Sequence, residues 1–580
     1  MKKIIKSILL LAAVSVGMGT LVSCNDDDDL TKADALFRPV INETDNVVHG
    51  LTADNVPYMI VNWDNYTDAN RYVVGIQATD GSDTRTIETD TTTYRFDDLQ
   101  YDKEYNITLQ AKSTVSGLES KPFSLTTTSL DYPTMLSTPA ASDIIDIAAR
   151  IRWAEGTVYD KLEIYKDSND SLVTTVNLSS EQLSELAAIV SNLEPKTTYK
   201  VLAYENGAYR GKKRFTTAAP ESFSGAVIDL RDEMDSIAKT YFTTDQLAAD
   251  VEANAGKNLT YVLKGGFVYK VSGGTALPST ANTIKFVTGL TLEGNANFLQ
   301  SGGFTMASGA DINSVVFEKI DFVSDKVNNG SNPVDTNHEK GWGGRQVFNV
   351  NGTKATMKSL TYRNCSFTGY RAVCRAQTAN DAVNNILLEG CQINCIGDQG
   401  VITTTNKAAD WQNVTLRNCT VTNIVMLCDL RSTAGTINFN IENCTFCYAP
   451  METTSNSNTP LLRLGSGNVN VKVKNSLFGP SMKSTDSSGD EIWTYEAGTA
   501  GTIMVTGTPN NLEVSDSYKT NFAWTDLGSD GEVKVFPMEG LGELSLDETK
   551  LWSNPSKGVF NIIGSQSGVD LKSLGDSRWW

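Results

Sequence analysis

Five polar side chains recur at one position of a repeated pattern and together offer guanidinium, carboxylate, amide and hydroxyl groups. They are Asn349, Arg375, Thr403, Asp429 and Arg463. Because arginine can bind a carboxylate through two parallel N–H···O bonds, this stripe predicts a binding site for an acidic ligand such as a uronate-containing sugar chain. The alternative is that Asp429 pairs with Arg375 or Arg463 inside the protein.

The same stripe also allows an enzymatic hypothesis. β-Elimination from a uronate requires a strong base, and Arg375, Arg431 and Arg463 are the candidates. Pectate-lyase chemistry commonly uses Ca²⁺, for which Asp429 and Asp398 are possible ligands, although Ca²⁺ prefers six or more oxygen ligands. Hydrolysis requires two carboxylates that flank the scissile bond, and no such pair is evident in the sequence. The sequence therefore leaves open whether this chain binds a polysaccharide or cleaves it, and no cofactor is assigned.

Two tryptophans are candidate platforms for a sugar ring beside the stripe. Trp342 belongs to an insertion at residues 323–344, and Trp411 lies in a segment predicted as a turn at residues 407–412. The alternative for both indoles is packing against the protein wall.

The elements that must position these side chains are short repeated strands. Alternating apolar residues, a charge, an Asn or Gly and usually a Cys recur at 360–367, 386–393, 414–421, 439–446 and 471–478. The cysteines at 365, 391, 419 and 444 are 26, 28 and 25 residues apart. A period of this length with one strand and turn per repeat predicts a solenoid. We therefore predict a right-handed parallel β-helix.

A second column has the same period and fixes the register of the stripe. Its inward members are Phe348, Cys374, Ile402, Cys428 and Leu462. Successive side chains of a strand point to opposite faces, so the residue that follows each of these five faces outward. The stripe is thus expected on the outer face of consecutive coils.

The Asn or Gly that precedes the Cys position in each repeated segment also has a structural interpretation. Asn and Gly tolerate left-handed backbone, so each coil is expected to turn a corner there. The preceding charges alternate in sign from coil to coil, which predicts lateral salt bridges rather than a binding site. Eight cysteines lie between residues 365 and 447. A ladder of buried thiols is favoured for them, with disulfides left open.

The N-terminus has the pattern of a secretory signal peptide at residues 1–23. Leu21–Cys24 resembles a bacterial lipobox, which implies that Cys24 is lipidated. The acidic run Asp26–Asp29 resembles the surface-export tag of Bacteroidota lipoproteins, within a tether at residues 24–35. We therefore expect a cell-surface lipoprotein of the outer membrane that contacts the membrane only through its lipid.

Composition excludes one class of partner. The chain has 580 residues and a formal net charge of −19, which argues against nucleic acid as a ligand. An anionic glycan is also repelled on average, so it would depend on local arginines or a bridging cation. The length predicts several domains.

Two smaller modules are expected before the solenoid. Residues 36–128 alternate in short strands, and residues 129–220 repeat the pattern more weakly. The segment Leu99–Ile107 resembles the corner of a fibronectin type III domain, and Trp63 fits its buried tryptophan. Residues 221–580 are assigned to the β-helix. A helix over residues 245–255 is expected to cap its first coil, and residues 574–580 are expected to seal the other end.

Together these features resemble an uncharacterised family of pectate-lyase-like β-helix lipoproteins with fibronectin type III modules. The resemblance implies an all-β fold and a link to plant cell-wall polysaccharides, notably pectins. The leading hypothesis is a surface protein that binds acidic polysaccharide on the lateral face of its β-helix. The alternatives are a polysaccharide lyase and a structural or adhesive protein.

Overall fold

The computed structural model describes residues 34–325, 345–352, 354–378, 382–404, 409–450, 459–481, 483–484, 493–494, 504–524 and 535–580. The predicted signal peptide, Cys24 and Trp342 therefore lie outside the described residues. The chain forms two compact units, and their boundary passes through the second sandwich. Among the described residues, no helix has the length and apolar character needed to cross a membrane.

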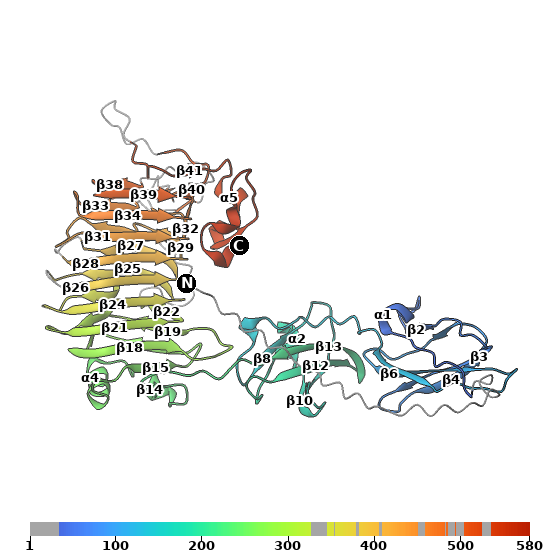
Figure 1. Cartoon of the computed structure of the whole chain (residues 1–580). Helices are drawn as coiled ribbons and strands as arrows, with labels where there is room; N and C mark the ends of the chain where they lie inside the picture. Colours follow the sequence, from blue (N-terminus) through green and yellow to red (C-terminus); the bar gives the residue numbers. More distant parts are fainter. Residues whose placement is uncertain are drawn as a thin grey trace, which may run out of the picture. The chain divides into compact units, whose positions relative to one another are not determined.

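The first module is a sandwich of two antiparallel sheets (Figure 1). The sheets have the orders β1-β2-β5 and β4-β3-β6-β7, which is the strand order of a fibronectin type III domain. Trp63 is buried in its core, and the Tyr105 hydroxyl accepts a hydrogen bond from the backbone N–H of Gln100 at 3.2 Å. This bond forms the predicted tyrosine corner. The elements are α1 (Glu43–Asn46), β1 (Val47–Leu51), β2 (Pro57–Asn62), β3 (Arg71–Ala78), β4 (Thr84–Thr89), β5 (Thr93–Phe96), β6 (Glu104–Lys112) and β7 (Phe123–Thr128).

The second module repeats the architecture with fewer strands. Its sheets have the orders β10-β9-β12-β13 and β11-β8, so the prediction of two fibronectin type III-like sandwiches is confirmed. A short helix that begins with a capping box at Ser179 joins β10 to β11. The elements are β8 (Ala149–Arg152), β9 (Lys161–Lys166), β10 (Leu172–Asn177), α2 (Ser180–Glu185), β11 (Ala187–Val190), β12 (Thr198–Glu205) and β13 (Ala208–Thr216).

Most of the remaining strands form the predicted parallel β-helix, whose coils stack one above another in Figure 1. One face is a ten-stranded sheet in which neighbouring strands are successive coils. Its strands are β14 (Ala226–Asp229), β15 (Leu259–Leu263), β18 (Thr280–Thr288), β21 (Asp311–Glu318), β24 (Thr356–Arg363), β26 (Ala382–Glu389), β28 (Asp410–Arg417), β31 (Ile437–Glu442), β34 (Val469–Lys474) and β39 (Asn511–Ser515).

A sixteen-stranded sheet forms the rest of the wall and has two branches, which the long strands β25 and β27 join. The first branch consists of β16 (Val268–Val271), β19 (Ala296–Gln300), β22 (Ile320–Ser324), β25 (Ser366–Ala376), β27 (Gln392–Thr403), β29 (Thr420–Ile424), β32 (Thr445–Cys447), β35 (Leu477–Phe478), β40 (Tyr518–Lys519) and β41 (Gly542–Glu543). The second adds β17 (Thr275–Leu277), β20 (Phe304–Met306), β23 (Gln346–Val350), β30 (Cys428–Leu430), β33 (Leu462–Leu464) and β38 (Val505–Thr506).

The solenoid interior is filled by columns of like side chains. Phe286, Phe317 and Tyr362 stack at centroid distances of 4.9 and 5.2 Å. All eight described cysteines are buried and free, so the ladder consists of thiols. Burial raises the pKa of the Cys391 thiol well above its usual value, which keeps it protonated and apolar.

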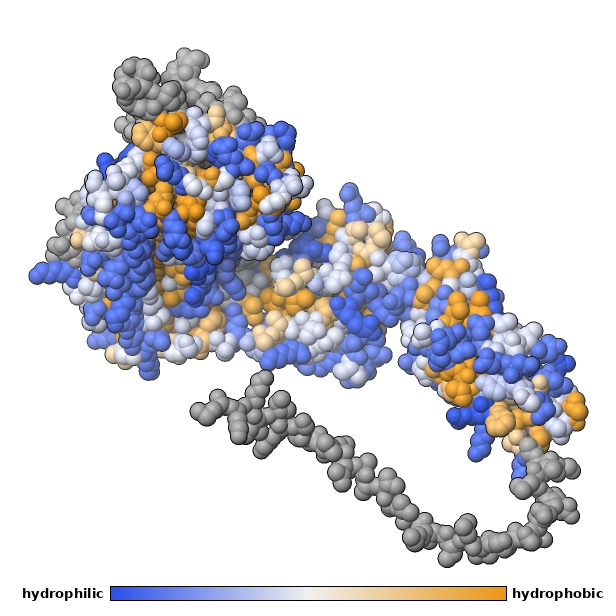
Figure 2. All heavy atoms as spheres, turned by 45° about the horizontal axis from the view of Figure 1, so that its top comes forward, coloured by the Kyte–Doolittle hydropathy of each residue, from blue (hydrophilic) through white to orange (hydrophobic). Residues whose placement is uncertain are grey.

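The corners and charges of the coils follow the sequence pattern. Asn364, Asn418, Asn443 and Asn475 have φ values of 51°, 52°, 52° and 50°, so the predicted left-handed corner is confirmed. The charges before the corners pair between neighbouring coils from Arg363 to Glu442, with Arg363 Nε 3.0 Å from Glu389 Oε2 and Arg417 Nε 2.8 Å from Glu442 Oε2. Figure 2 shows hydrophilic side chains over much of the solenoid surface in view.

The first coil is covered by a helix, as predicted. Helix α4 (Thr244–Ala253) begins at the N-cap Thr243, whose hydroxyl accepts from Gln246 N, and it buries Leu247 against the solenoid core. A shorter helix, α3 (Asp235–Ala238), precedes it.

The prediction that residues 574–580 seal the far end is wrong. They lie along the side of the solenoid, beside the corner column. Gly575 N donates to Asn475 O at 2.8 Å, Ser577 N to Asn418 Oδ1 at 2.8 Å, and Arg578 Nη2 to Gly390 O at 2.6 Å. Its polar groups therefore bond to residues of several successive coils rather than to the last coil alone. This segment follows α5 (Glu548–Leu551), β42 (Trp552–Asn554) and β43 (Val559–Ile562). Strands β36 (Lys483–Ser484) and β37 (Trp493–Thr494) form a separate hairpin.

Candidate ligand-binding site

The strand registers bring the five stripe residues side by side. Phe348 pairs with Cys374, Cys374 with Ile402, Ile402 with Cys428, and Cys428 with Leu462 across β23, β25, β27, β30 and β33. The next residue of each strand is therefore also aligned, in the order Asn349, Arg375, Thr403, Asp429, Arg463. The alignment inferred from the sequence is confirmed, while the roles of the residues remain predictions.

The stripe borders a small polar cavity of about 200 Å³. Four arginines but only two aspartates line it, so two positive charges are uncompensated among its lining residues. The lining consists of Arg371, Arg375, Ala376, Asp398, Gln399, Thr403, Asp429, Arg431 and Arg463. Since pockets for drug-sized ligands are about 300–1,000 Å³, this cavity is suited to one charged group rather than a long ligand segment.

Asp429 organises one side of the cavity. It is only 2% exposed, and it accepts two hydrogen bonds from Arg431, Nε to Oδ1 at 2.9 Å and Nη2 to Oδ2 at 2.8 Å. Arg463 Nη1 lies 3.4 Å from Oδ2 of the same carboxylate. Pairing of Asp429 within the protein, the alternative considered from the sequence, therefore occurs with Arg463 and also with Arg431.

Arg371 and Asp398 form a second bidentate pair on the opposite side. Arg371 Nε donates to Oδ1 at 2.7 Å and Nη2 to Oδ2 at 2.9 Å. Arg371 was not predicted from the sequence. The register of β25 against β27 shifts between Tyr370 and Ala372, so Arg371 lies outside the aligned column. The 27-residue separation of Arg371 and Asp398 equals about one coil and was an available signal.

Arg375 differs from the other three arginines. Within the described part of the chain, its half-buried guanidinium pairs with no carboxylate. Burial, and then the neighbouring Arg371 cation, lower the pKa of Arg375 below its usual value. Beside it, the Asn349 side chain donates from Nδ2 to Gln377 Oε1. Arg375 is therefore the guanidinium with donors available to an incoming anion.

The geometry gives little support to a metal at Asp429 and Asp398. Both carboxylates face guanidinium groups, and each has both oxygens engaged. Across the described ranges, no group of three or more His, Cys, Asp or Glu side chains could hold a metal ion. Ca²⁺ requires several oxygen ligands, which these two paired residues do not provide.

The prediction that Trp411 is a sugar platform is wrong. Trp411 lies in β28 rather than in a turn, pairs in register with the inward residue Val383, and is 1% exposed. Strand alternation turns its indole into the solenoid core, so no ligand ring can stack on it. The other tryptophan of the hypothesis, Trp342, lies outside the described residues.

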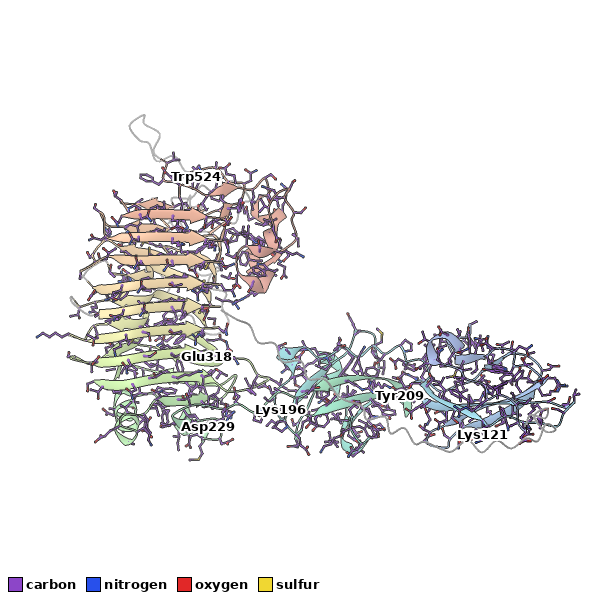
Figure 3. The ribbon with its side chains drawn as sticks, in the orientation of Figure 1. Lys121, Lys196, Tyr209, Asp229, Glu318 and Trp524 are labelled. Atoms are coloured by element: carbon purple, nitrogen blue, oxygen red, sulfur yellow. The ribbon has the colours of Figure 1, made fainter. Side chains whose placement is uncertain are left out.

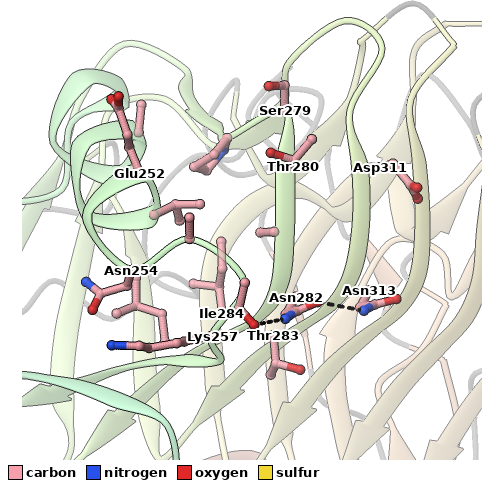
Figure 4. A pocket seen from close by; sticks show the side chains of 17 residues that line it. Glu252, Asn254, Lys257, Ser279, Thr280, Asn282, Thr283, Ile284, Asp311 and Asn313 are labelled. Atoms are coloured by element: carbon pink, nitrogen blue, oxygen red, sulfur yellow. Dashed lines mark hydrogen bonds between the residues drawn. The ribbon is translucent and has the colours of Figure 1, made fainter.

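A larger hollow of about 570 Å³ lies beside α4, away from the stripe (Figure 4). Its labelled amides are used internally, since Asn282 Nδ2 donates to Gly256 O at 2.5 Å and Asn313 Nδ2 to Asn282 Oδ1 at 3.2 Å. We place the candidate site at the smaller cavity, because its lining contains more arginines than carboxylates.

Comparisons with known proteins assign no family. No family model and no curated protein matches the chain. Solved structures include a two-domain fibronectin type III segment of chicken tenascin, at 18% identity over 30% of this chain and 100% of that one, with a TM-score of 0.15. The FN1–FN3 domains of chicken CNTN1 match at 14% identity over 32% of this chain and 65% of that one, with a TM-score of 0.14. The assignment of the sandwiches rests on their strand order.

Proposed function

We propose that this protein binds acidic polysaccharide on the lateral face of its β-helix, with the arginine cavity receiving the carboxylate of one uronate unit. The observation that carries the proposal is the guanidinium of Arg375, which has no carboxylate partner among the described residues, beside three arginines that are already paired. A carboxylate fits a guanidinium through two parallel hydrogen bonds. It would also neutralise charge that the cavity leaves uncompensated.

The small volume favours recognition of one unit within a chain. Because the cavity lies on the lateral face of the solenoid, the remainder of a polymer could run along the solenoid surface. Gln399, whose Oε1 accepts from Gln346 Nε2 at 2.8 Å, keeps its amide N–H groups as candidate donors to a sugar hydroxyl group. A uronate-containing plant polysaccharide such as pectin is the ligand class we propose.

The N-terminal sequence supports a location for this protein at the cell surface. A signal peptide, lipidation at Cys24 and an acidic tether would hold the protein on the outer surface of the outer membrane. The two sandwiches would then act as spacers before the binding domain. Labelling intact cells with radioactive palmitate tests this part of the proposal, since a Cys24→Ala variant should incorporate none.

A lyase is the second candidate, and Arg375 is again the residue that favours it. Its guanidinium is not committed to a carboxylate, and its lowered pKa is in the direction that a general base requires. Both carboxylates among the described lining residues, Asp398 and Asp429, already pair with arginines, so binding without cleavage is the function we favour. A purely adhesive role would leave the arginine cavity without a ligand.

One experiment separates these functions. The chain without residues 1–24 is incubated with polygalacturonate, rhamnogalacturonan or neutral glycans, with and without Ca²⁺. Co-sedimentation reports binding, and ultraviolet absorbance of unsaturated uronate reports β-elimination. Retention on a uronate polymer without absorbance supports the binding function. Rising absorbance replaces it with the lyase, and neither signal with any acidic polymer contradicts both.

A further inference from the structure

A second cavity, of about 600 Å³, lies between loops and strands of the two sandwiches. All of its lining residues belong to one compact unit of the chain. They are Asn55, Val56, Pro57, Leu99, Gln100, Tyr101, Asp102, Lys103, Tyr132, Lys200, Leu202, Tyr209 and Lys212. The volume lies within the range of small-molecule sites, which are typically concave and lined by aromatic groups with a few polar ones.

Three tyrosines form its aromatic wall. The rings of Tyr101 and Tyr132 meet edge to face at a centroid distance of 5.0 Å, and Tyr132 meets Tyr209 at 5.8 Å. Tyr209 is labelled in Figure 3. All three rings are half-buried, so each retains surface toward solvent. The Tyr101 hydroxyl is fixed in place because it donates to the backbone carbonyl of Asn55.

Asp102 holds this wall in position. Its carboxylate accepts from the Tyr209 hydroxyl at 2.6 Å and from the backbone N–H of Tyr132 at 3.0 Å, and Lys212 Nζ lies 2.7 Å away. Burial and the hydrogen bond to Asp102 raise the pKa of Tyr209, which keeps its hydroxyl protonated as a donor. The cavity is therefore preorganised before any ligand arrives.

Each lysine of this cavity is paired with a carboxylate inside the protein. Lys103 pairs with Asp80, Lys200 Nζ lies 2.5 Å from Asp170 Oδ1, and Lys212 pairs with Asp102. These pairs engage the lysine ammonium groups and so lower their attraction for an anion. The exposed amides of Asn55 and Gln100 lie at its rim and can bond to hydroxyl groups.

We propose that this cavity is a second binding site, which takes a neutral sugar ring. The apolar C–H face of a pyranose packs on tyrosine rings, while its hydroxyl groups bond to the amides of Asn55 and Gln100. An anionic sugar is less favoured here than at the arginine cavity, because each lysine of the lining already pairs with a carboxylate. The two sites would accordingly recognise different parts of a polysaccharide, and this one does not depend on the carboxylate site.

The test uses the whole chain without residues 1–24 and calorimetric titration with neutral oligosaccharides of galactose, arabinose or glucose. We expect one of them to bind the native protein. Tyr132→Ala should weaken that binding at least tenfold, and Tyr132→Phe should retain it because the ring remains. Tyr58→Ala is the matched control, since Tyr58 follows the lining residue Pro57 and points to the other face of β2.

Uronate oligosaccharide is titrated in parallel as an independent readout. Binding of uronate that survives Tyr132→Ala shows that the variant is folded, and loss of neutral-sugar binding alone then supports the proposal. The proposal is overturned if none of the neutral sugars binds the native protein. It is also overturned if Tyr132→Ala binds them as well as the native protein does, or if Arg375→Ala abolishes their binding.

Discussion

Arginine side chains in the lateral cavity are held in two different ways. Arg431 and Arg463 share the buried carboxylate of Asp429, and Arg371 has Asp398 to itself. A guanidinium that pairs with a carboxylate already uses some of its N–H donors, although its positive charge still contributes to the local potential. Arg375 lines the same cavity and pairs with no carboxylate of the described residues, so it is the residue on which ligand binding should depend most.

Replacing Arg375 should therefore reduce affinity more than replacing any other arginine of the cavity. Arg375→Ala removes at least one hydrogen bond between charged groups, worth about 1.5–3 kcal/mol, so uronate oligosaccharides should bind at least roughly 10- to 150-fold more weakly. Arg375→Lys should be intermediate, because a lysine keeps the charge but loses the two-point geometry. Arg363→Ala is the control, since that arginine pairs with Glu389 in the row of salt bridges before the coil corners. Equal losses for Arg363 and Arg375 would contradict the assignment.

At the scale of the element, the repeated corner controls how coils stack. Gly294 and Gly390 occupy the corner position with φ values of 87° and 64°. A Cβ at Gly294 would meet no atom within 4 Å, whereas a Cβ at Gly390 would collide with the Asn364 side chain of the neighbouring coil. The two glycines thus have the same backbone requirement but different surroundings.

This pair provides a matched test of coil packing. Gly294→Ala should cost about 1–2 kcal/mol, the strain of a left-handed alanine. Gly390→Ala should cost about 1–3 kcal/mol more, because it also crowds Asn364. Thermal unfolding followed by circular dichroism should show the larger fall in midpoint for Gly390→Ala. Equal shifts would mean that Asn364 moves aside freely.

The C-terminal segment is an element whose docking should depend on pH. The Asp576 side chain is buried beside Thr420 and Arg578, and burial raises the pKa of its carboxyl above the usual 3.8. The docked segment therefore binds a proton more readily than the undocked one. Docking is expected to strengthen as pH falls through the raised pKa and to weaken as pH rises through it.

Hydrogen exchange of the segment measures this dependence. Amides of Leu571–Trp580, corrected for intrinsic exchange rates, should be better protected at mildly acidic pH than at neutral pH. Asp576→Asn should remove most of this difference, because the amide does not titrate in this range. A pH dependence that persists in the variant would assign it to another group.

Local rules account for the features that were predicted correctly. The left-handed corners at Asn418 and Asn443 follow from one residue type at one position, and the register of the stripe follows from the period of the coils. Features that break the period were missed. The shift between Tyr370 and Ala372 hid Arg371, and the early start of β28 at Asp410 turned Trp411 inward. The C-terminal segment docks through hydrogen bonds between residues that are separated by 159 and 188 positions in the sequence. No local pattern reveals contacts over such separations.

At the scale of the whole molecule, the arginine cavity is an exception to the overall charge. The formal net charge of the chain is −19, yet the cavity lining carries two uncompensated positive charges. A polyuronate approaching from a distance meets repulsion, and only its contacting unit meets attraction. Both effects are screened by salt, but over different distances.

Ionic strength should therefore affect binding in two opposing directions. The Debye length is about 30 Å at 0.01 M salt, where repulsion from the whole molecule reaches the ligand, and about 8 Å at 0.15 M, where it does not. Association of polygalacturonate should become faster between these concentrations, while contacts at Arg375 persist because they are partly shielded from solvent. At about 1 M salt those contacts weaken too, so affinity should be greatest at intermediate salt. Surface plasmon resonance across this range measures both rates. A steady loss of affinity from the lowest salt would mean that local attraction dominates at every distance, and neutral oligosaccharides, which carry no charge, should show no such dependence.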